Sequence, residues 1–283
     1  MPTFQTPEPI TAVVDITVGD VHISAGERRD TIVEVRPSDP SSRDDIKVAE
    51  GTRVELAGGH LIVRAPKLRS WLPRSHGGSI DVTIDLPVGS RLQASGQLTD
   101  YHADGPLGEC RIKTGMGSIQ LDEVATVNLR TGIGDIGVVR VTGNADVAAG
   151  SGEVRLRELD AAAVIKNSNG DTWIGEARGD LRVSAANGSI AVDVAEASVV
   201  AKSSNGDVRL GDIARGSVVL ETRLGDLEVG IREGTAAWLD VRAAAGKVHN
   251  ALEAAAGPEA AAETVEVRGR TTAGSVVIRR PAA

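Results

Sequence analysis

Residues 169–174 read NGDTWI, residues 187–192 read NGSIAV and residues 205–210 read NGDVRL. These related stretches begin 18 residues apart, and in each an Asn-Gly pair precedes alternating aliphatic or β-branched positions. Outward from them, the same pattern of a glycine, a polar residue and an aliphatic or β-branched one recurs along the chain. Its glycines are Gly19, Gly78, Gly117, Gly134, Gly152, Gly170, Gly188, Gly206, Gly225, Gly246 and Gly274. Seven consecutive intervals lie between 17 and 21 residues, which indicates a tandem repeat of about 18 residues.

Each repeat contains two alternating sets of apolar residues. One set lies two and four residues after the glycine, as in Ile190 and Val192, and the other precedes the next glycine, as in Leu181 and Val183. A spacing of two is the period of a strand with one buried face. Stacking of repeats about 4.8 Å apart would bury these faces together. We therefore predict an all-β fold, a single-stranded parallel β-solenoid (β-helix) with about 18 residues per turn and right-handed winding. One buried column should contain Ile136, Val154, Thr172, Ile190 and Val208.

Two other repeat folds fit the pattern less well. The left-handed hexapeptide helix needs an aliphatic residue every six positions, which the two alternating sets do not provide. The calcium-binding nonapeptide solenoid needs paired turns of nine residues with an Asp two residues after a glycine. Here the Asp follows the glycine directly, as in Gly206-Asp207.

The first hundred residues are less regular than the rest. We predict that residues 1–107 form an irregular N-terminal cap and early turns, and that residues 108–283 form the regular solenoid with a loop excursion near 253–264. Within the first part, Ser42 is placed to cap a short helix over residues 43–49. Residues 53–64 are typical of a hairpin around Gly58-Gly59.

The composition restricts the class of protein. The 283 residues carry a formal net charge of −8, and 41% of them are hydrophobic but only 2% aromatic, so the core must be aliphatic. The single cysteine, Cys110, falls on an inward position of its strand and is predicted to be buried. No run of about 18 apolar residues is present, so no transmembrane segment is predicted. The first residues lack the pattern of a signal peptide, which favours a cytoplasmic location.

Two polar columns accompany the glycines. Asn169, Asn187 and Asn205 are predicted to form a hydrogen-bonded ladder at a tight corner, with a ligand-binding role as the alternative. The next column contains Asp135, Glu153, Asp171, Ser189, Asp207 and Asp226. One carboxylate per turn lacks the clustered loop that Ca²⁺ needs, so these residues are predicted to cap turns and no metal site is expected.

A basic stripe is predicted on the outward side of the second strand of each repeat. The positions four and six residues before each glycine hold nine basic and three acidic residues. Such a face is suited to an anionic polymer, anionic lipid or an acidic partner, although it lacks aromatic platforms for nucleic-acid bases. The alternative is a solvated face that guards against aggregation. The candidate binding residues are Lys113, Arg130, Lys166, Arg182, Lys202, Arg242 and Arg270.

A second candidate contact lies in a basic loop containing Arg69, Trp71 and Arg74. A tryptophan among arginines is typical of a contact anchor, and the alternative is that Trp71 folds back onto the core. Trp173 is expected on an outer face, one turn from Arg155, where the two side chains can stack.

Catalysis finds little support in the sequence. The five histidines are scattered without metal-ligand spacing, and neither a phosphate-binding loop nor a dinucleotide fingerprint is present. We therefore predict no catalytic residues, no cofactor and no bound metal. A polysaccharide-active enzyme remains as the weakest alternative.

The repeated Gly-Asp motif, in Gly134-Asp135-Ile136, Gly206-Asp207-Val208 and Gly225-Asp226-Leu227, resembles a bacterial family known as putative adhesins with β-strand repeats, a domain of unknown function. The resemblance spans the whole chain and implies a single-stranded solenoid without established catalytic residues, in cell-envelope settings. The predicted function is a non-catalytic, adhesin-like scaffold that binds an unknown protein partner or itself. The alternative is a binder of an anionic polymer or membrane surface.

Overall fold

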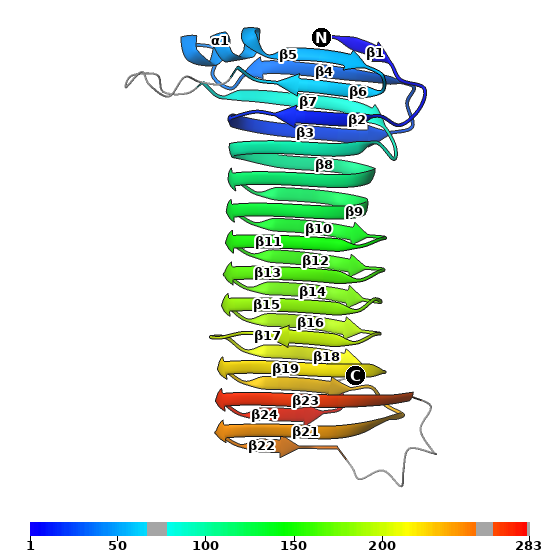
Figure 1. The fold of residues 1–283 in the computed structure, drawn as a ribbon, viewed down its shortest axis with the longest axis vertical. Helices are drawn as coiled ribbons and strands as arrows, with labels where there is room; N and C mark the ends of the chain where they lie inside the picture. Colours follow the sequence, from blue (N-terminus) through cyan, green and yellow to red (C-terminus); the bar gives the residue numbers. More distant parts are fainter. Residues whose placement is uncertain (67–77, 253–262, 282–283) are drawn as a thin grey trace. The chain divides into compact units, whose positions relative to one another are not determined.

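A computed structural model describes residues 1–66, 78–252 and 263–281 of the chain. The chain divides into two compact units, Met1–Val139 and Arg140–Ala283. Almost all described residues that have regular structure lie in strands (Figure 1), so the predicted all-β class is confirmed.

The residues of unit 1 that the structure describes form nine strands and one helix. They are β1 (Thr3–Gln5), β2 (Thr11–Asp15), β3 (Val18–Gly26), β4 (Asp30–Pro37), α1 (Arg43–Gly51), β5 (Arg53–Ala57), β6 (His60–Arg64), β7 (Ile80–Pro87), β8 (Arg91–Met116) and β9 (Ile119–Ile133). Strand β10 (Ile136–Val141) crosses the boundary between the units.

The strands of unit 2 follow in chain order. They are β11 (Ala145–Ser151), β12 (Val154–Leu159), β13 (Ala163–Asn169), β14 (Thr172–Ala177), β15 (Leu181–Asn187), β16 (Ile190–Ala195), β17 (Val199–Lys202), β18 (Val208–Ile213), β19 (Gly216–Leu224), β20 (Leu227–Ile231), β21 (Thr235–Ala245), β22 (Val248–Asn250), β23 (Glu263–Ala273) and β24 (Val276–Arg279).

Parallel pairing at the 18-residue spacing confirms the predicted solenoid in unit 2. Strand β12 pairs with β14, β14 with β16 and β16 with β18, so that Val154, Thr172, Ile190 and Val208 are successive register partners. All four are buried, as is Ile136. The predicted inward face is therefore correct, and stacked aliphatic columns form the core.

The glycine of each repeat is required by close approach of neighbouring coils. Gly188 has φ +142°, and a Cβ there would lie 2.6 Å from the carbonyl carbon of Gly170 and closer still to its oxygen. Glycine alone meets both conditions, since it tolerates positive φ and has no Cβ.

Both predicted polar columns are structural. The Asn187 amide donates to Asn169 Oδ1 at 2.9 Å, and the Asn205 amide donates to Asn187 Oδ1 at 2.8 Å. In the neighbouring column, Asp171 Oδ1 accepts from the backbone N–H of Ser189 at 2.8 Å. The asparagine ladder is thus confirmed, and the Asp171 carboxylate accepts from a backbone N–H at the same corner of the next coil.

A buried column of polar side chains satisfies backbone carbonyls. We call the position of the repeated glycine the anchor position. The hydroxyl or amide groups of this column donate to the carbonyl of the anchor position in the neighbouring coil, as Thr222 Oγ1 does to Gly206 at 2.9 Å. The column contains Thr114, Thr131, Asn167, Ser203, Thr222 and Thr271. These bonds explain why small polar residues are buried here, since an unpaired buried carbonyl is unfavourable.

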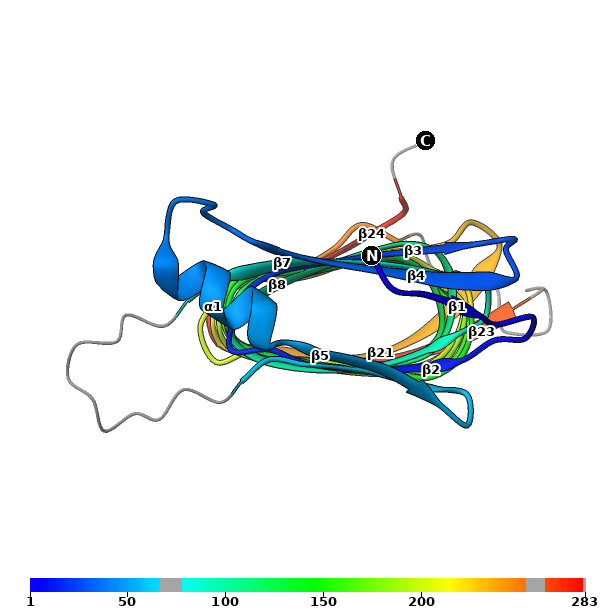
Figure 2. The same ribbon diagram turned by 90° about the horizontal axis from the view of Figure 1, so that it is seen from above.

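The N-terminal coils of unit 1 do not follow the chain in order. Strands β2 and β3 lie between β6 and β7 on one side and β8 on the other. Antiparallel strands then cover the outermost level, since β5 pairs with β6, and β4 pairs with both β7 and β1. Figure 2 looks along this stack, with α1 across one end of the coil. The Ser42 side chain accepts from the N–H of Asp45, which confirms the predicted helix cap, and the pairing of β5 with β6 confirms the hairpin.

One coil of unit 1 has no glycine at the anchor position, so the series of repeated glycines does not include it. Gly19 is the register partner of Thr99, and Tyr101 is the partner of Ile119, so Thr99 occupies the anchor position 18 residues before Gly117. Gly78, which the series included, is not among the glycines with positive φ.

The last coils of unit 2 also stack out of chain order. Strands β23 and β24 pair with β19 and β20 on one side and with β21 and β22 on the other. Each repeat was expected to stack on the next one in sequence, and this expectation is wrong at the C-terminal end. The expected excursion near 253–264 falls almost entirely on residues outside the described ones. No helix in the described part of the chain has the length and apolar character needed to span a bilayer.

Candidate functional site

The outward side chains of six neighbouring strands in unit 2 form one continuous row. Successive register partners along β13, β15, β17, β19, β23 and β21 are Lys166, Ser184, Lys202, Glu221, Arg270 and Arg242. All four basic residues of the row are exposed, as expected from the alternation along each strand. The C-terminal part of this row therefore gathers Lys202, Arg270 and Arg242, although they are far apart in sequence.

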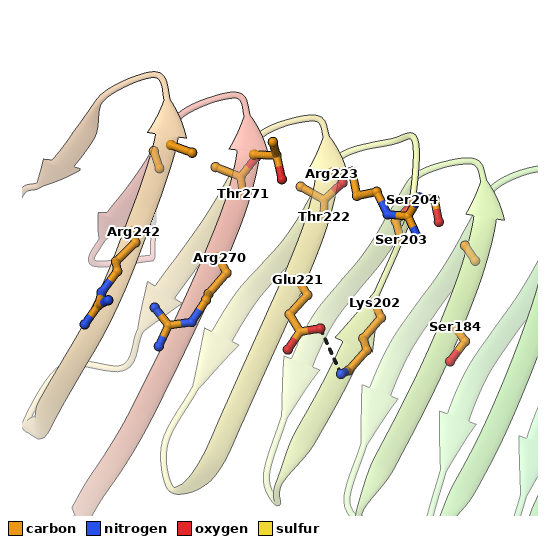
Figure 3. Close-up of a pocket in the computed structure, with 14 residues that line it drawn as sticks. Ser184, Lys202, Ser203, Ser204, Glu221, Thr222, Arg223, Arg242, Arg270 and Thr271 are labelled. Carbon is orange, nitrogen blue, oxygen red and sulfur yellow. Dashed lines mark ion pairs between the residues drawn. The ribbon is translucent and has the colours of Figure 1, made fainter.

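The row borders a shallow groove of about 780 Å³, shown in Figure 3. The ionisable residues that line it are four cations, Lys202, Arg223, Arg242 and Arg270, and one carboxylate, Glu221. We call this surface the cationic groove. Its excess of positive charge contrasts with the net charge of −8 of the whole chain.

Ion pairs offset part of this charge. Lys202 Nζ lies 2.8 Å from Glu221 Oε2, and Arg270 Nη2 lies 2.8 Å from Asp240 Oδ2. Arg242 Nε is 3.5 Å from the other oxygen of Asp240. Such exposed pairs are worth at most about 1 kcal/mol each, so an anionic ligand can replace these carboxylates at small cost.

The hydroxyl groups along the groove divide into two classes. Ser203, Thr222 and Thr271 are buried and donate to glycine carbonyls, so they hold the coil together. Ser184 and Thr272 are exposed and Ser204 is half-buried, and all three line the groove. The groove therefore presents hydroxyl groups as well as basic side chains to solvent.

The remaining residues of the predicted basic stripe lie elsewhere. Lys166 and Arg182 lie on β13 and β15, and neither lines the groove. Lys113 and Arg130 are register partners on β8 and β9 of unit 1. The structure thus gathers three of the seven predicted residues around one groove.

The predicted basic loop and the tryptophans have different outcomes in the structure. Arg69, Trp71 and Arg74 lie outside the described residues. The Trp173 indole donates to Asp193 at 3.1 Å, while Arg155 pairs with Glu153 at 2.6 Å. Trp238, which the sequence reasoning did not single out, is 59% exposed on β21.

Arg223 was also missed, because it lies two residues before Gly225, outside the positions considered for the stripe. A survey of all exposed cations near the turn would have found it. Cys110 offers no nucleophile, since it is fully buried and desolvation raises the pKa of its thiol to about 12. The predicted burial of Cys110 is confirmed.

Comparison with known proteins gives a family and a set of solved structures. Residues 12–264 match the family described as Toastrack DUF4097. The chain is similar to a putative adhesin from Parabacteroides merdae ATCC 43184, with 12% identity, TM-score 0.45 and coverage of 97% of this chain and 94% of that chain. It is also similar to a putative lipid binding protein from Parabacteroides distasonis ATCC 8503, with 10% identity, TM-score 0.37 and coverage of 99% and 94%. None of the curated proteins matches the chain.

Proposed function

This chain belongs to the Toastrack DUF4097 family, and we propose that it is a non-catalytic, adhesin-like scaffold that binds other molecules through the surfaces of its coils. Long, regular parallel ladders support this proposal, since they hold outward side chains at fixed spacing. Among the described groove residues the one carboxylate, Glu221, is paired with Lys202. Glycoside hydrolysis typically uses two carboxylates, so the polysaccharide-active alternative has weaker support.

The observation that carries the proposal is the outermost coil of unit 2, which is formed by β21 and β22. Strand β21 is 11 residues long and, within the described residues, pairs with β23 along one edge and with no strand along the other. Val248 of β22 is the register partner of Val276, which in turn is the partner of Leu227. Leu227 and Val276 are buried, whereas Val248 is 45% exposed. A long edge strand with exposed apolar side chains is a ready template for pairing with another chain.

A second copy of this chain is the partner that fits this edge best. In an antiparallel pairing centred on Val241, Asp240 of each copy faces Arg242 of the other. The same register places Leu239 opposite Ala243 and Trp238 opposite Ala244, so apolar side chains meet. Opposite charges directly across a strand pair are favourable, and like charges are unfavourable.

Self-association can be tested by measuring mass against protein concentration with light scattering. We expect a dimer that weakens in Asp240→Arg and in Arg242→Asp, because each single change opposes like charges. The double variant with both changes restores opposite charges and should restore the dimer. A matched truncation, Trp173→Ala, should leave the dimer intact, whereas Trp238→Ala should weaken it. A monomer at all concentrations, or equal dimers in all variants, would refute this interface.

The cationic groove supports a second function, the binding of an anionic polymer. Four cations and one carboxylate line it, and three of the cations take part in the ion pairs with Glu221 and Asp240 described above. Because released counterions drive such binding, affinity should fall steeply as salt rises. A polymer is favoured over a membrane, since the charges line a groove.

A charge-matched pair of variants tests this second function. Arg223→Ser with Arg270→Ser removes two groove cations, whereas Arg155→Ser with Arg209→Ser removes two from strands β12 and β18. We expect the groove variant to weaken heparin and single-stranded DNA and to lower the salt slope for DNA by roughly 1 to 2. Equal effects from both pairs would argue against the groove. Binding to phosphatidylserine vesicles but not to either polymer would assign the groove to membranes. The cytoplasmic location expected from the sequence stays a prediction.

A further inference from the structure

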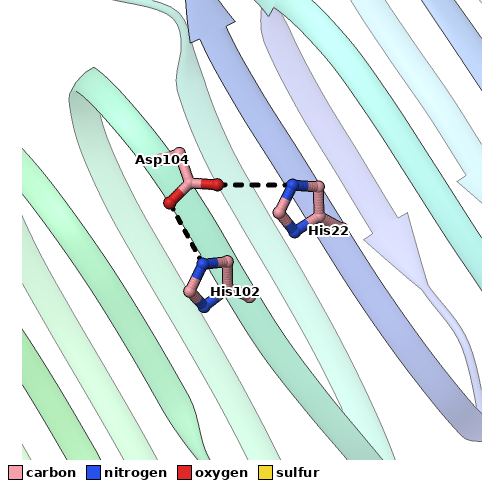
Figure 4. Close-up of side chains that lie close together, drawn as sticks. All are labelled: His22, His102 and Asp104. Carbon is pink, nitrogen blue, oxygen red and sulfur yellow. Dashed lines mark hydrogen bonds and ion pairs between the residues drawn. The ribbon is translucent and has the colours of Figure 1, made fainter.

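Two histidines and an aspartate come together on the outer surface of unit 1. His22 lies on β3, and His102 and Asp104 lie on β8. His22 Nε2 is 3.3 Å from Asp104 Oδ2, and His102 Nε2 is 3.0 Å from Asp104 Oδ1. The imidazole rings are stacked, with centroids 5.1 Å apart and planes 10° from parallel. Both Nε2 atoms point toward the carboxylate in Figure 4.

The register of the coils produces this cluster. Gly19 and Thr99 are partners at the anchor position, so His22 and His102, each three residues later, are also partners. Strand alternation turns both outward, because Val21, Ile23, Tyr101 and Ala103 are buried. Asp104 follows His102 by two residues and so shares its face. The backbone ladder thus fixes the places from which all three side chains extend.

The three side chains offer the ligand atoms of a transition-metal site. Two imidazole nitrogens and one carboxylate oxygen lie within 4.8 Å of one another. Zinc bonds to His nitrogen and carboxylate oxygen are about 2.0–2.2 Å long, so two ligand atoms of a tetrahedral ion lie roughly 3.3 Å apart. The nitrogen–oxygen separations, 3.3 Å from His22 to Oδ2 of Asp104 and 3.0 Å from His102 to Oδ1, are close to this spacing, although each histidine contacts a different carboxylate oxygen.

The chemistry selects the class of ion. Imidazole favours Zn²⁺, Cu²⁺ and Ni²⁺, whereas Ca²⁺ and Mg²⁺ prefer a shell of oxygen ligands. We propose that His22, His102 and Asp104 form a binding site for one divalent transition-metal ion of the zinc type. Bound metal joins β3 to β8 across two coils and, with three protein ligands, keeps a coordination position open to solvent. The site is separate from the cationic groove and does not depend on the proposed function.

Titration of the full, chelator-treated chain with ZnCl₂ in a calorimeter tests the site. We expect one ion per chain with a micromolar dissociation constant, and no displacement of Zn²⁺ by millimolar Ca²⁺. His22→Ala and His102→Ala should each weaken binding at least tenfold. His60→Ala removes an exposed histidine elsewhere in the same unit and should leave binding unchanged.

A spectroscopic readout separates loss of ligands from loss of folding. Co²⁺ in place of Zn²⁺ should give strong visible absorption bands of a four-coordinate ion, lost in both histidine variants. Asp104→Asn keeps the shape of the side chain and should weaken Co²⁺ binding while the metal-free variant keeps the circular dichroism spectrum of the original protein. Absence of Zn²⁺ binding at 100 μM, or full binding by folded His22→Ala and His102→Ala variants, would overturn the proposal.

Discussion

Replacement of Gly188 by alanine should destabilise unit 2 strongly. The backbone at Gly188 has φ +142°, which an alanine rarely adopts. The new Cβ would lie 2.6 Å from the carbonyl carbon of Gly170, whereas ordinary contact begins at 3.4 Å. The neighbour is a backbone group held in a ladder, so it cannot rotate away as a side chain would.

The two effects can be added. Positive φ costs a non-glycine residue about 1–2 kcal/mol, and overpacking typically costs about 1–3 kcal/mol. We therefore expect Gly188→Ala to lower the free energy of unfolding by about 2–5 kcal/mol. For a unit of this size each kcal/mol shifts Tm by roughly 2–4 °C, so Tm should fall by roughly 4–20 °C.

Thermal unfolding followed by circular dichroism, with urea unfolding at 25 °C, measures this loss. Gly234→Ala is the matched control in the same unit, because Gly234 has φ +80° but a Cβ added there would meet no atom within 4 Å. The control should lose only about 1–2 kcal/mol, the backbone contribution. Equal losses in the two variants would refute the argument that contact between coils requires this glycine.

Changes in the core and in the ladders have four further expected outcomes. Since burial raises the pKa of the Cys110 thiol to about 12, the folded protein should react with a thiol reagent at pH 8 far more slowly than the unfolded chain. Folding favours the neutral thiol, so this stabilisation is complete below the ordinary thiol pKa of about 8.5 and is lost as pH rises toward 12. Urea midpoints should therefore fall more above pH 9 in the original protein than in Cys110→Val, and parallel curves would contradict the shift. Asn187→Ala removes two amide hydrogen bonds and should reduce stability by about 1–2 kcal/mol in urea unfolding. Thr222→Val removes the donor to the Gly206 carbonyl and should cost about 1–2 kcal/mol, whereas an unchanged midpoint would show that the bond is dispensable.

The regular coils could be predicted because each repeat carries its own signal. Ile190 and Val192 alternate as a half-buried strand must, and Asn187-Gly188 marks the corner that precedes them. Identical spacing in successive repeats then fixes the register without any knowledge of the structure. Burial of Cys110 followed from the same alternation.

Features that depend on contacts between distant segments could not be predicted in this way. Thr99 takes the place of an anchor glycine, so the coil that contains it has no glycine signal. His22 and His102 are 80 residues apart, and only that missing coil brings them into register. The groove gathers Arg242 and Arg270 beside Lys202 because β23 is inserted between β19 and β21. Local periodicity contains no information on the order in which coils stack.

The insertion of β23 and β24 has a consequence for synthesis of the chain. Residues 235–250 leave the ribosome before residues 263–279. In the folded protein, however, residues 235–250 pair with the later segment, which in turn pairs with the rest of unit 2. Growth of the stack from one end, one repeat at a time, therefore stops at β20 until the last strands emerge. A nascent chain that ends before Glu263 lacks β23 and β24, so β21 and β22 also lose their pairing partners. Two coils are then left without ordered pairing, and we expect such fragments to be cleaved readily by proteases.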